Sequence, residues 1–503
     1  MIEMTLAQVA EATGAALPAD APGELLVTSA EFDTRRVQPG ALFVALVGDH
    51  ADGHDFAAAA RGAGAVAVLG SRDLPADAGL PLLRVPDGDG GDPNAGVLAA
   101  LARLAQASVK ALVVGHDLQV VGVTGSSGKT STKDLIAAVL SASGDPVVAP
   151  PESFNNELGH PYTALRATPQ TRYLVLELSA RGKGHIAELA RIAPPRIGAV
   201  LNVGSAHLGE FGSVEGIAEA KSELVQALPS GSVLPGRGGV AILNADDERV
   251  AAMADRTDAE VVLVGQDPAA TVRAEDVTAD DADRAVFTLV TPEGSAPVRL
   301  SVVGAHQIGN ALSAAAVGRA VGMPVEQVAD ALSAAGPASK WRMDVTELAG
   351  GVLLVNDAYN ANPHSTKAAL RSLAKMKRSR PGRAWAVLGE MAELGDSAIE
   401  AHDEVGRLVV RLGIDQLIVV GAEGAGRSSL ARALHLGAHL EGSWGGESLP
   451  VSDVDEAVAV LIEELADGDV VLVKASRSVG LERVATALID RIGTADRTGE
   501  AGA

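Results

Sequence analysis

Short apolar runs alternate with helical stretches through the middle of the chain. VVGVTG from Val120, LVLEL at Leu174–Leu178 and IGAVLNV at Ile197–Val203 have the character of strands, as do the later runs VAILNADD and VVLVG. Thr130–Ser143 carries apolar residues at helical spacing, and a further helical stretch covers His306–Val321. Strands that are apolar throughout and alternate with helices are typical of a parallel sheet covered on both faces.

Similar patterns before and after this region predict two further units. The first, up to about Asp117, ends in a loop-rich patch and an Ala/Leu-rich helix. After Gly336 and Pro337 the alternation restarts with VLLVND, RAWAVLGEM, QLIVVG and DVVLVKAS, which predicts a Rossmann-like domain. The polar stretch 267–298 is expected to be an irregular, hairpin-like insertion. We therefore expect three α/β domains, at 1–117, 118–336 and 337–492, followed by a disordered tail at 493–503.

Composition agrees with this organisation and excludes several functions. A chain of 503 residues is too long for one core. The net charge of −23 argues against non-specific nucleic-acid binding, and the absence of cysteine excludes disulfides and zinc–thiolate sites. Residues 1–20 lack the features of a secretory signal, and we find no uncharged apolar stretch of about 18 residues. The expected location is the cytoplasm.

The strongest local signal is VTGSSGKTSTKDL, in which a buried strand runs into a Gly/Ser turn and then a helix. Such a turn points backbone N–H groups and the positive end of the helix dipole at an anion. Gly125 and Gly128 permit close approach, Lys129 can reach the β and γ phosphates, and Thr130 can bind Mg²⁺. Val123 stands where the usual phosphate loop has its first glycine, so this loop is of a shorter kind. The predicted loop residues are Gly125, Ser126, Ser127, Gly128, Lys129, Thr130 and Ser131.

With the loop TGSSGKTSTK in view, the chain resembles the Mur ligase family. Further motifs of that family follow in order: ELSA around Glu177, NVGSAHLGEFGS around His207, AKSEL at Lys221, GAHQIGN from Gly304 and KWRMD around Arg342. The resemblance covers nearly the whole chain. It implies an N-terminal domain that binds a UDP-linked substrate, a central ATPase-like domain and a C-terminal domain that closes on the nucleotide and acceptor. It also implies an ATP-dependent ligase that forms a C–N bond.

Three stretches resemble the branch that adds D-alanyl-D-alanine to UDP-N-acetylmuramoyl-tripeptide in peptidoglycan synthesis, and so serves the cell wall, cell shape and division. These are FNNELGHP (Phe154–Pro161), NDAYNANPHS (Asn356–Ser365) and VLGEMAELG (Val387–Gly395). The D-N-P-R motif expected of the diamino-acid-adding branch does not occur in the sequence. KASRS (Lys474–Ser478) and LSAR depart from the usual family motifs K-G-S-R-S and M-G-A-R. The alternatives are another Mur-type ligase, a folylpolyglutamate synthetase-like ligase, and a P-loop NTPase switch that only hydrolyses ATP.

Ligation begins by phosphorylating a carboxylate, which brings two negative groups together and requires positive charge. Lys129 and Mg²⁺ would supply it. Glu177 ends an apolar strand near the phosphate loop, where ligands of parallel sheets bind, and the resemblance implies that it binds Mg²⁺. The resemblance implies a second metal-site role for His207, which alone would read as a structural histidine. It also implies that Lys221, by composition a solvated lysine, is carbamylated and binds metal as an anion.

The resemblance assigns the remaining candidates. Asn155 and Asn156 correspond to residues near the transferred phosphate and the acceptor, and Asn310 to an adenine contact. Arg342 is expected to contact phosphate and Asp357 the ribose. The weaker candidates for acceptor or closure contacts are Asn360, Asn362 and Lys474. The expected UDP-side residues are Thr34, Arg35, Asp52, Gly53 and His54. Both substrates are small molecules, and the protein is expected to be a monomer.

Overall fold

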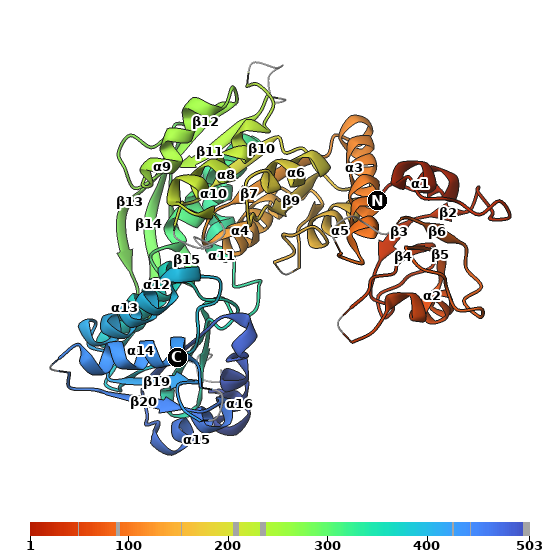
Figure 1. The fold of residues 1–503 in the computed structure, drawn as a ribbon. Coiled ribbons are helices and arrows are strands. Elements are labelled where there is room, and N and C mark those ends of the chain that lie inside the picture. Colours follow the sequence, from red (N-terminus) through yellow and green to blue (C-terminus); the bar gives the residue numbers. More distant parts are fainter. Residues whose placement is uncertain are drawn as a thin grey trace, which may run out of the picture.

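Three α/β units follow one another in the structure, a computed structural model (Figure 1). It describes residues 1–48, 50–86, 91–151, 153–204, 211–231, 238–424, 427–442 and 444–495. The first unit (red in Figure 1) and the third (blue) attach to different parts of the central one. The three-domain α/β architecture expected from the sequence is confirmed.

The first unit is built on a small parallel sheet. Its elements are β1 (Met4–Thr5), α1 (Leu6–Thr13), β2 (Leu26–Val27), β3 (Ser29–Glu31), β4 (Ala41–Val44), η1 (Gly53–Phe56), α2 (Ala57–Ala63), β5 (Ala65–Gly70) and β6 (Leu82–Arg84). The order is β3-β4-β5-β6, all parallel, and β1 and β2 form a separate antiparallel pair. Thr5 begins α1 with a capping box, in which its side chain accepts from Gln8 N and the Gln8 side chain accepts from Thr5 N.

Helix α3 (Ala95–His116) leads from the first unit to the second. Among the described residues it is the one helix with the length and hydropathy of a membrane span. It packs against α1 in the first unit and against α5 (Gly159–Leu165) and α6 (His185–Ile192) in the second. Its buried Leu101, Leu104 and Leu112 belong to a core shared by the two units. This packing is that of a core helix.

A nine-stranded sheet forms the central unit. Besides α5 and α6, its elements are β7 (Gln119–Thr124), α4 (Lys129–Ser141), β8 (Val147–Val148), β9 (Tyr173–Glu177), β10 (Ile197–Val200), α8 (Val214–Gln226), β11 (Val240–Asn244), α9 (Glu248–Ala251), η2 (Ala252–Arg256), β12 (Glu260–Gly265), β13 (Val272–Ala279), β14 (Arg284–Thr291), β15 (Gly294–Val303), α10 (Gln307–Ala320) and α11 (Val325–Ala334). The order is β15-β14-β13-β12-β11-β10-β7-β9-β8. Helices α4, α10 and α11 contribute to the core on one face, and α3, α5, α6 and α8 to the core on the other.

The polar stretch 267–298 is more regular than the sequence suggests. Strands β14 and β15 are antiparallel to their neighbours and, with β13, extend the parallel sheet. Buried and less buried side chains alternate along β14, and α11 packs against β14 and β15. A strand with one covered and one open face carries many polar residues, which explains why the segment reads as irregular.

The third unit has a six-stranded sheet. Its elements are β16 (Asp344–Glu347), η3 (Ala349–Gly351), β17 (Leu353–Asn356), α12 (Pro363–Arg378), β18 (Ala384–Leu388), η4 (Gly395–Ser397), α13 (Ala398–Arg411), β19 (Gln416–Val420), α14 (Ser429–Leu440), β20 (Glu447–Val451), α15 (Val454–Glu464), β21 (Val470–Lys474), η5 (Arg477–Val479) and α16 (Glu482–Ile492). The order is β16-β17-β21-β18-β19-β20, parallel except for β16. Helices α12, α13 and α14 cover one face, and α15 and α16 the other.

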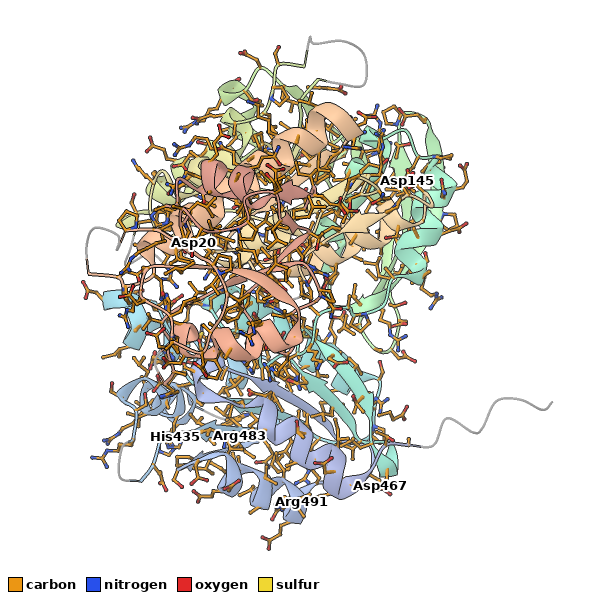
Figure 2. All side chains as sticks on the ribbon, turned by 90° about the vertical axis from the view of Figure 1, so that its right-hand side faces the viewer. Asp20, Asp145, His435, Asp467, Arg483 and Arg491 are labelled. Atoms are coloured by element: carbon orange, nitrogen blue, oxygen red, sulfur yellow. The ribbon has the colours of Figure 1, made fainter. Side chains whose placement is uncertain are left out.

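The four strands predicted in this unit are present as β17, β18, β19 and β21, whereas the edge strands β16 and β20 were not predicted. The first residues of the expected tail pair with the sheet edge, since Ala495 N donates to Glu347 O at 3.0 Å and Thr494 bridges Leu348. Residues 496–503 lie outside the described part of the chain. The charged residues Asp20, Asp145 and Asp467 are exposed and lie in different parts of the molecule (Figure 2).

Candidate active site

One cavity of about 350 Å³ lies where the central and third units meet. It is bounded by the β7–α4 turn, the loop after β9, the start of α10 and the start of α12. Fourteen of the sequence-predicted site residues line it: Ser126, Ser127, Gly128, Lys129, Thr130, Ser131, Asn155, Asn156, Asn310, Arg342, Asp357, Asn360, Asn362 and Lys474. These residues come from widely separated segments, and the fold brings them together.

The β7–α4 turn has the geometry expected of a phosphate loop. Gly128 has a φ of +82°, a left-handed conformation that favours glycine, and a Cβ there would lie 2.6 Å from Asn310 Oδ1, so the amide would also have to move. Helix α4 starts at the next residue and points its free N–H groups into the cavity opening. Lys129 Nζ donates to Gly125 O at 2.8 Å, which folds the side chain back on its own loop. Burial lowers the pKa of Lys129, while the Glu177 charge opposes that shift.

Glu177 ends β9 beneath the loop and is fully buried. Thr130 Oγ1 donates to Glu177 Oε2 at 3.3 Å, and Asn155 Nδ2 donates to the same oxygen at 3.4 Å. The other oxygen, Oε1, is buried and has no hydrogen-bond partner among the described residues. Burial raises the pKa of Glu177, against the charges of Lys133, Lys129 and Arg342. A buried carboxylate with a free oxygen beside a hydroxyl is suited to a hard cation.

Of the two further metal-site candidates, the structure describes Lys221 but not His207. Lys221, in α8, is buried, and burial together with the Lys129 charge lowers its pKa to about 7. It is therefore not the solvated lysine that its composition indicates. His207 lies in 205–210, outside the described residues. Within the described residues no group of three or more His, Asp or Glu forms a metal cluster.

Arg342 reaches the phosphate loop from the segment that joins the second and third units. Its Nη2 donates to Thr130 Oγ1 at 3.3 Å and to Ser153 Oγ at 3.2 Å, and its guanidinium lies 4.2 Å from the centre of the Tyr359 ring. The residues on both sides are held in left-handed conformations, with φ of +59° at Trp341 and +50° at Met343. Such conformations cost about 1–3 kcal/mol each and persist only where the surroundings enforce them.

Asp357 and Lys474 form a buried ion pair at the third-unit side of the cavity. Lys474 Nζ lies 2.5 Å from Asp357 Oδ2 and donates to Asn360 O at 2.8 Å. The second oxygen, Asp357 Oδ1, accepts from Met343 N at 3.1 Å. Burial lowers the pKa of Lys474, and Asp357 opposes this. The pair therefore holds the linking segment in the conformation that presents Arg342.

Several cavity residues were not singled out from the sequence. Asn202 accepts from Ser127 N at 2.9 Å through Oδ1 and donates to Ser127 O at 3.1 Å, so it fixes the phosphate loop. His364, at the start of α12, lies 3.2 Å from Ser127 Oγ through Nδ1 and makes a second contact between the third unit and the loop. Asn202 stood within the quoted motif NVGSAHLGEFGS, and His364 within NDAYNANPHS, but neither motif shows which side chain faces the cavity.

The five UDP-side candidates lie in the first unit, and none of them lines the described cavity. Arg35 is exposed and pairs with Asp33 at 2.7 Å. Asp52 accepts from His54 at 2.6 Å and from Arg72 at 2.7 Å. His54 is buried, and its Nε2 accepts from Ser71 N at 3.2 Å and Arg72 N at 3.3 Å, so both ring nitrogens are engaged inside the protein. Gly53 begins η1, and Thr34 lies in the loop after β3.

Three family models match successive parts of the chain. They are the Mur ligase family catalytic domain at residues 27–90, the Mur ligase middle domain at 123–318 and the Mur ligase glutamate ligase domain at 341–477. These segments correspond to the three units of the fold. The resemblance seen in the sequence motifs is thereby confirmed.

Full-length relatives and solved structures agree with the family models. The chain is 52% identical to the UDP-N-acetylmuramoyl-tripeptide–D-alanyl-D-alanine ligase of Mycobacterium tuberculosis, over 97% of this chain and 98% of that one. Identity to the Escherichia coli enzyme of the same name is 35%, over 97% and 99%. A MurF crystal structure from Acinetobacter baumannii superposes with a TM-score of 0.80 at 29% identity, covering 97% and 99% of the chains. An ADP complex of MurF from Thermotoga maritima gives 0.74 at 28% identity, over 93% and 98%. The chain therefore belongs to the Mur ligase family.

Proposed function

We propose that this protein adds D-alanyl-D-alanine to UDP-N-acetylmuramoyl-tripeptide in an ATP-dependent reaction of peptidoglycan precursor synthesis. The observation that carries the proposal is the cavity in which Lys129, Thr130 and Arg342 from two units converge above the buried Glu177. The relatives that match the chain over nearly its full length carry this activity in their names. Use of ATP is supported by the ADP complex of a similar ligase.

The reaction has two steps. The γ-phosphoryl group of ATP passes to the tripeptide carboxylate and gives an acyl phosphate and ADP. The amine of D-alanyl-D-alanine then attacks the acyl carbon, an amide forms, and inorganic phosphate and a proton leave. Lys129 and the N-terminus of α4 stabilise the negative charge that accumulates at the phosphates. Arg342 contributes from the segment that leads into the third unit, beside Thr130, where its planar guanidinium can contact two phosphate oxygens.

The residues around Glu177 fit a bound Mg²⁺. The free Oε1 of Glu177 and the hydroxyl of Thr130 are hard oxygen ligands, which Mg²⁺ prefers. Bound there, the ion would supply charge stabilisation to the phosphate oxygens. We propose Thr130, Glu177 and His207 as the metal-site residues, with Lys221 as a carbamate.

Carbamylation of Lys221 is chemically reasonable because its pKa is lowered to about 7. At neutral pH a large share of the amine is then uncharged, and only the uncharged amine adds to CO₂. Addition forms an N–C bond and releases a proton, which leaves an anion in place of an ammonium. This change removes a buried positive charge close to Lys129 and provides a further oxygen ligand.

We propose the other substrate contacts from the resemblance to the family. We assign Gly125–Ser131, Asn310, Arg342 and Asp357 to ATP, with Asn310 facing the adenine. Asp357 faces the ribose, and Asn155, Asn156, Asn360, Asn362 and Lys474 face the acceptor and the reacting groups. The UDP end of the substrate is assigned to the first unit, where Thr34, Arg35, Asp52, Gly53 and His54 lie. For His54 and Asp52 the role is to hold the loop, because their polar atoms are already engaged.

We further propose domain boundaries at 1–117, 118–336 and 337–492, and a cytoplasmic monomer, since ATP and UDP-linked precursors are intracellular substrates. Strand β7 begins at Gln119 and α11 ends at Ala334, close to these boundaries.

Mass spectrometry of a reaction containing ATP, UDP-N-acetylmuramoyl-tripeptide and D-alanyl-D-alanine tests the function. The expected products are the ligated pentapeptide nucleotide, ADP and phosphate, with no phosphate release when D-alanyl-D-alanine is omitted. Lys129→Ala should fold normally and lose at least about a thousandfold in turnover, equivalent to about 4 kcal/mol. ATP hydrolysis without any amine, and no ligated product, would instead identify a nucleotide switch.

A further inference from the structure

Tyr162 lies at the junction between the first and second units. It belongs to α5, and its hydroxyl donates to Glu31 Oε2 at 2.8 Å, at the end of β3. Its ring packs edge-on against Phe32 of the first unit and Phe154 of the second, with centroid distances of 4.9 and 5.8 Å. The Arg36 guanidinium lies nearby, and its interaction with Tyr162 raises the pKa of Arg36. A single aromatic residue therefore joins a strand end of the first unit to a loop of the second.

On the first-unit side, the contact is made by a buried carboxylate. Glu31 is 9% exposed, and its Oε1 accepts from Phe32 N at 2.9 Å and Asp33 N at 3.1 Å. The same side chain thus fixes the start of the loop that carries Thr34 and Arg35. Because a buried carboxylate oxygen that loses a donor costs about 1–3 kcal/mol, the Tyr162 hydroxyl is an important part of this arrangement.

On the second-unit side, α5 is tied to the loop that lines the ATP cavity. Asn156 Oδ1 accepts from Gly159 N at 2.9 Å, and Asn156 O accepts from His160 N at 3.0 Å. A Cβ at Gly159 would lie 2.6 Å from Phe154 Cβ, so the helix and this loop are in close contact. The neighbouring Asn155 donates to Glu177. The loop that lines the cavity and α5 are therefore held as one body.

We propose that Tyr162 is a positioning residue, which through Glu31 fixes the first unit on α5 and so sets the distance between the UDP end of the substrate and the ATP cavity. The proposal rests on the function proposed above. A long substrate that is held at its nucleotide end must still deliver its carboxylate to the cavity within bonding reach of the phosphate. An error of about 1 Å in such a placement can cost up to about a hundredfold in rate.

The test compares two substrates with Tyr162→Phe, which keeps the ring contacts and removes only the hydroxyl. One substrate is UDP-N-acetylmuramoyl-tripeptide, and the other is the free tripeptide without the nucleotide sugar. We expect kcat/KM to fall about tenfold for the complete substrate and to stay within about twofold for the tripeptide, with ADP affinity unchanged. Tyr173→Phe, a buried tyrosine of β9 on the central sheet, is the matched control and should alter neither value.

Equal losses on both substrates, or no loss on the complete one, would overturn the positioning role. If the wild-type protein turns over the free tripeptide too slowly to measure, calorimetry of substrate binding replaces the comparison of the two substrates. The Kd of the UDP-linked tripeptide would then be measured with a non-hydrolysable ATP analogue bound. We expect it to rise about tenfold in Tyr162→Phe, and an unchanged Kd would refute the proposal. A wild-type protein that forms no ligated product at all would refute the proposed function instead, so the two failures are distinguishable.

Discussion

Arg342 and Thr130, 212 positions apart in the chain, meet at the edge of the phosphate loop, where Arg342 Nη2 donates to Thr130 Oγ1 at 3.3 Å. The arginine belongs to the segment that leads into the third unit, whereas the threonine is the second residue of helix α4 in the second unit. The guanidinium of Arg342 is also stacked on Tyr359, and Arg342 Nε is buried without a partner among the described residues. A buried donor without a partner is costly, so Arg342 is poised to gain an acceptor when phosphate enters the cavity.

We therefore expect Arg342→Lys to lose activity although it keeps the charge. The ammonium group of lysine is not planar, so it cannot stack on the Tyr359 ring as a guanidinium does. It also lacks the fork of N–H donors that lets arginine bond to Thr130, Ser153 and a phosphate at the same time. Turnover should fall about ten- to a hundredfold, which is about 1.4–2.8 kcal/mol in the activation free energy. Steady-state kinetics at saturating ATP check this. Arg299→Lys, at an exposed position of β15, is the control, and equal kinetics in both variants would contradict a phosphate role.

Lys221→Ala should abolish ligation, and short carboxylic acids in the buffer should restore part of it by occupying the vacated anion position. The exposed Lys110→Ala in α3 is the control and should behave as wild type. ¹³C NMR with labelled bicarbonate should show a carbamate signal that is absent from Lys221→Ala. Since the pKa of Lys221 is lowered to about 7, this signal should weaken as the pH falls below about 7. An active enzyme with no carbamate signal at pH 8 would disprove the modification.

The sequence predicted local features well and distant contacts poorly, for physical reasons. The phosphate loop is contiguous, so Gly125 to Ser131 could be recognised from spacing alone. The contacts between Ser127 and His364, or between Glu31 and Tyr162, join residues 237 and 131 positions apart, and only the folded chain brings them together. Local composition also misjudged Lys221, because helix α8 places it against the core instead of in solvent.

Strand prediction failed where strands have one open face. The apolar strands β7, β9 and β10 are buried on both sides and stand out in the sequence. In β16 and β20 few side chains are buried, because both strands lie at sheet edges and have a neighbour on one side only. Their polar residues resemble those of loops. Strands β14 and β15 carry polar residues for a different reason, because one face of each is covered and the other is open.

Protonation of His160 should destabilise the protein in mild acid. His160 is fully buried in α5, and burial lowers its pKa from 6.5 to about 4. Between pH 6.5 and 4 the unfolded chain therefore binds a proton that the folded state does not, and the free energy of unfolding falls as the pH falls. The full effect is about 3 kcal/mol. This loss of stability is complete at about pH 4 and absent above pH 6.5.

Urea unfolding of the wild type and of His160→Gln across this pH range measures the effect. Glutamine cannot be protonated, so the variant should lose less stability between pH 6.5 and 4.5, whatever its stability at pH 7. His116→Gln, at an exposed helix end, should keep the wild-type slope. Parallel slopes for wild type and His160→Gln would show that other groups cause the acid sensitivity.

One hydrogen bond between the linking segment and helix α4 limits where the third unit can pivot during domain closure. The sequence predicts a hinge at Gly336–Ala338, because the residues that the family resemblance assigns to one nucleotide fall on both sides of this segment. In the structure, Ser339 N donates to Asp134 Oδ2 at 3.1 Å, which ties Ser339 to helix α4 of the second unit. A rotation about Gly336 would have to break this contact. The left-handed residues Trp341 and Met343 come after the anchor, where a rotation would not disturb it.

We therefore predict that ATP and the UDP-linked substrate rotate the third unit about residues 340–343. We expect phosphate to draw Lys129 away from Gly125 O and to replace the direct contact between Ser127 and His364, since both contacts lie at the phosphate loop. Water is then excluded from the acyl phosphate, as the reaction requires.

Small-angle scattering should show a smaller radius of gyration with both ligands bound. Gly336→Ala, whose added Cβ meets open space, should close and turn over within about twofold of wild type. Hydrogen exchange should change at 340–343 and not at 336–339. An unchanged radius of gyration with both ligands bound would refute domain closure. A Gly336→Ala variant that fails to close or to turn over would show that the pivot lies at Gly336 and Pro337.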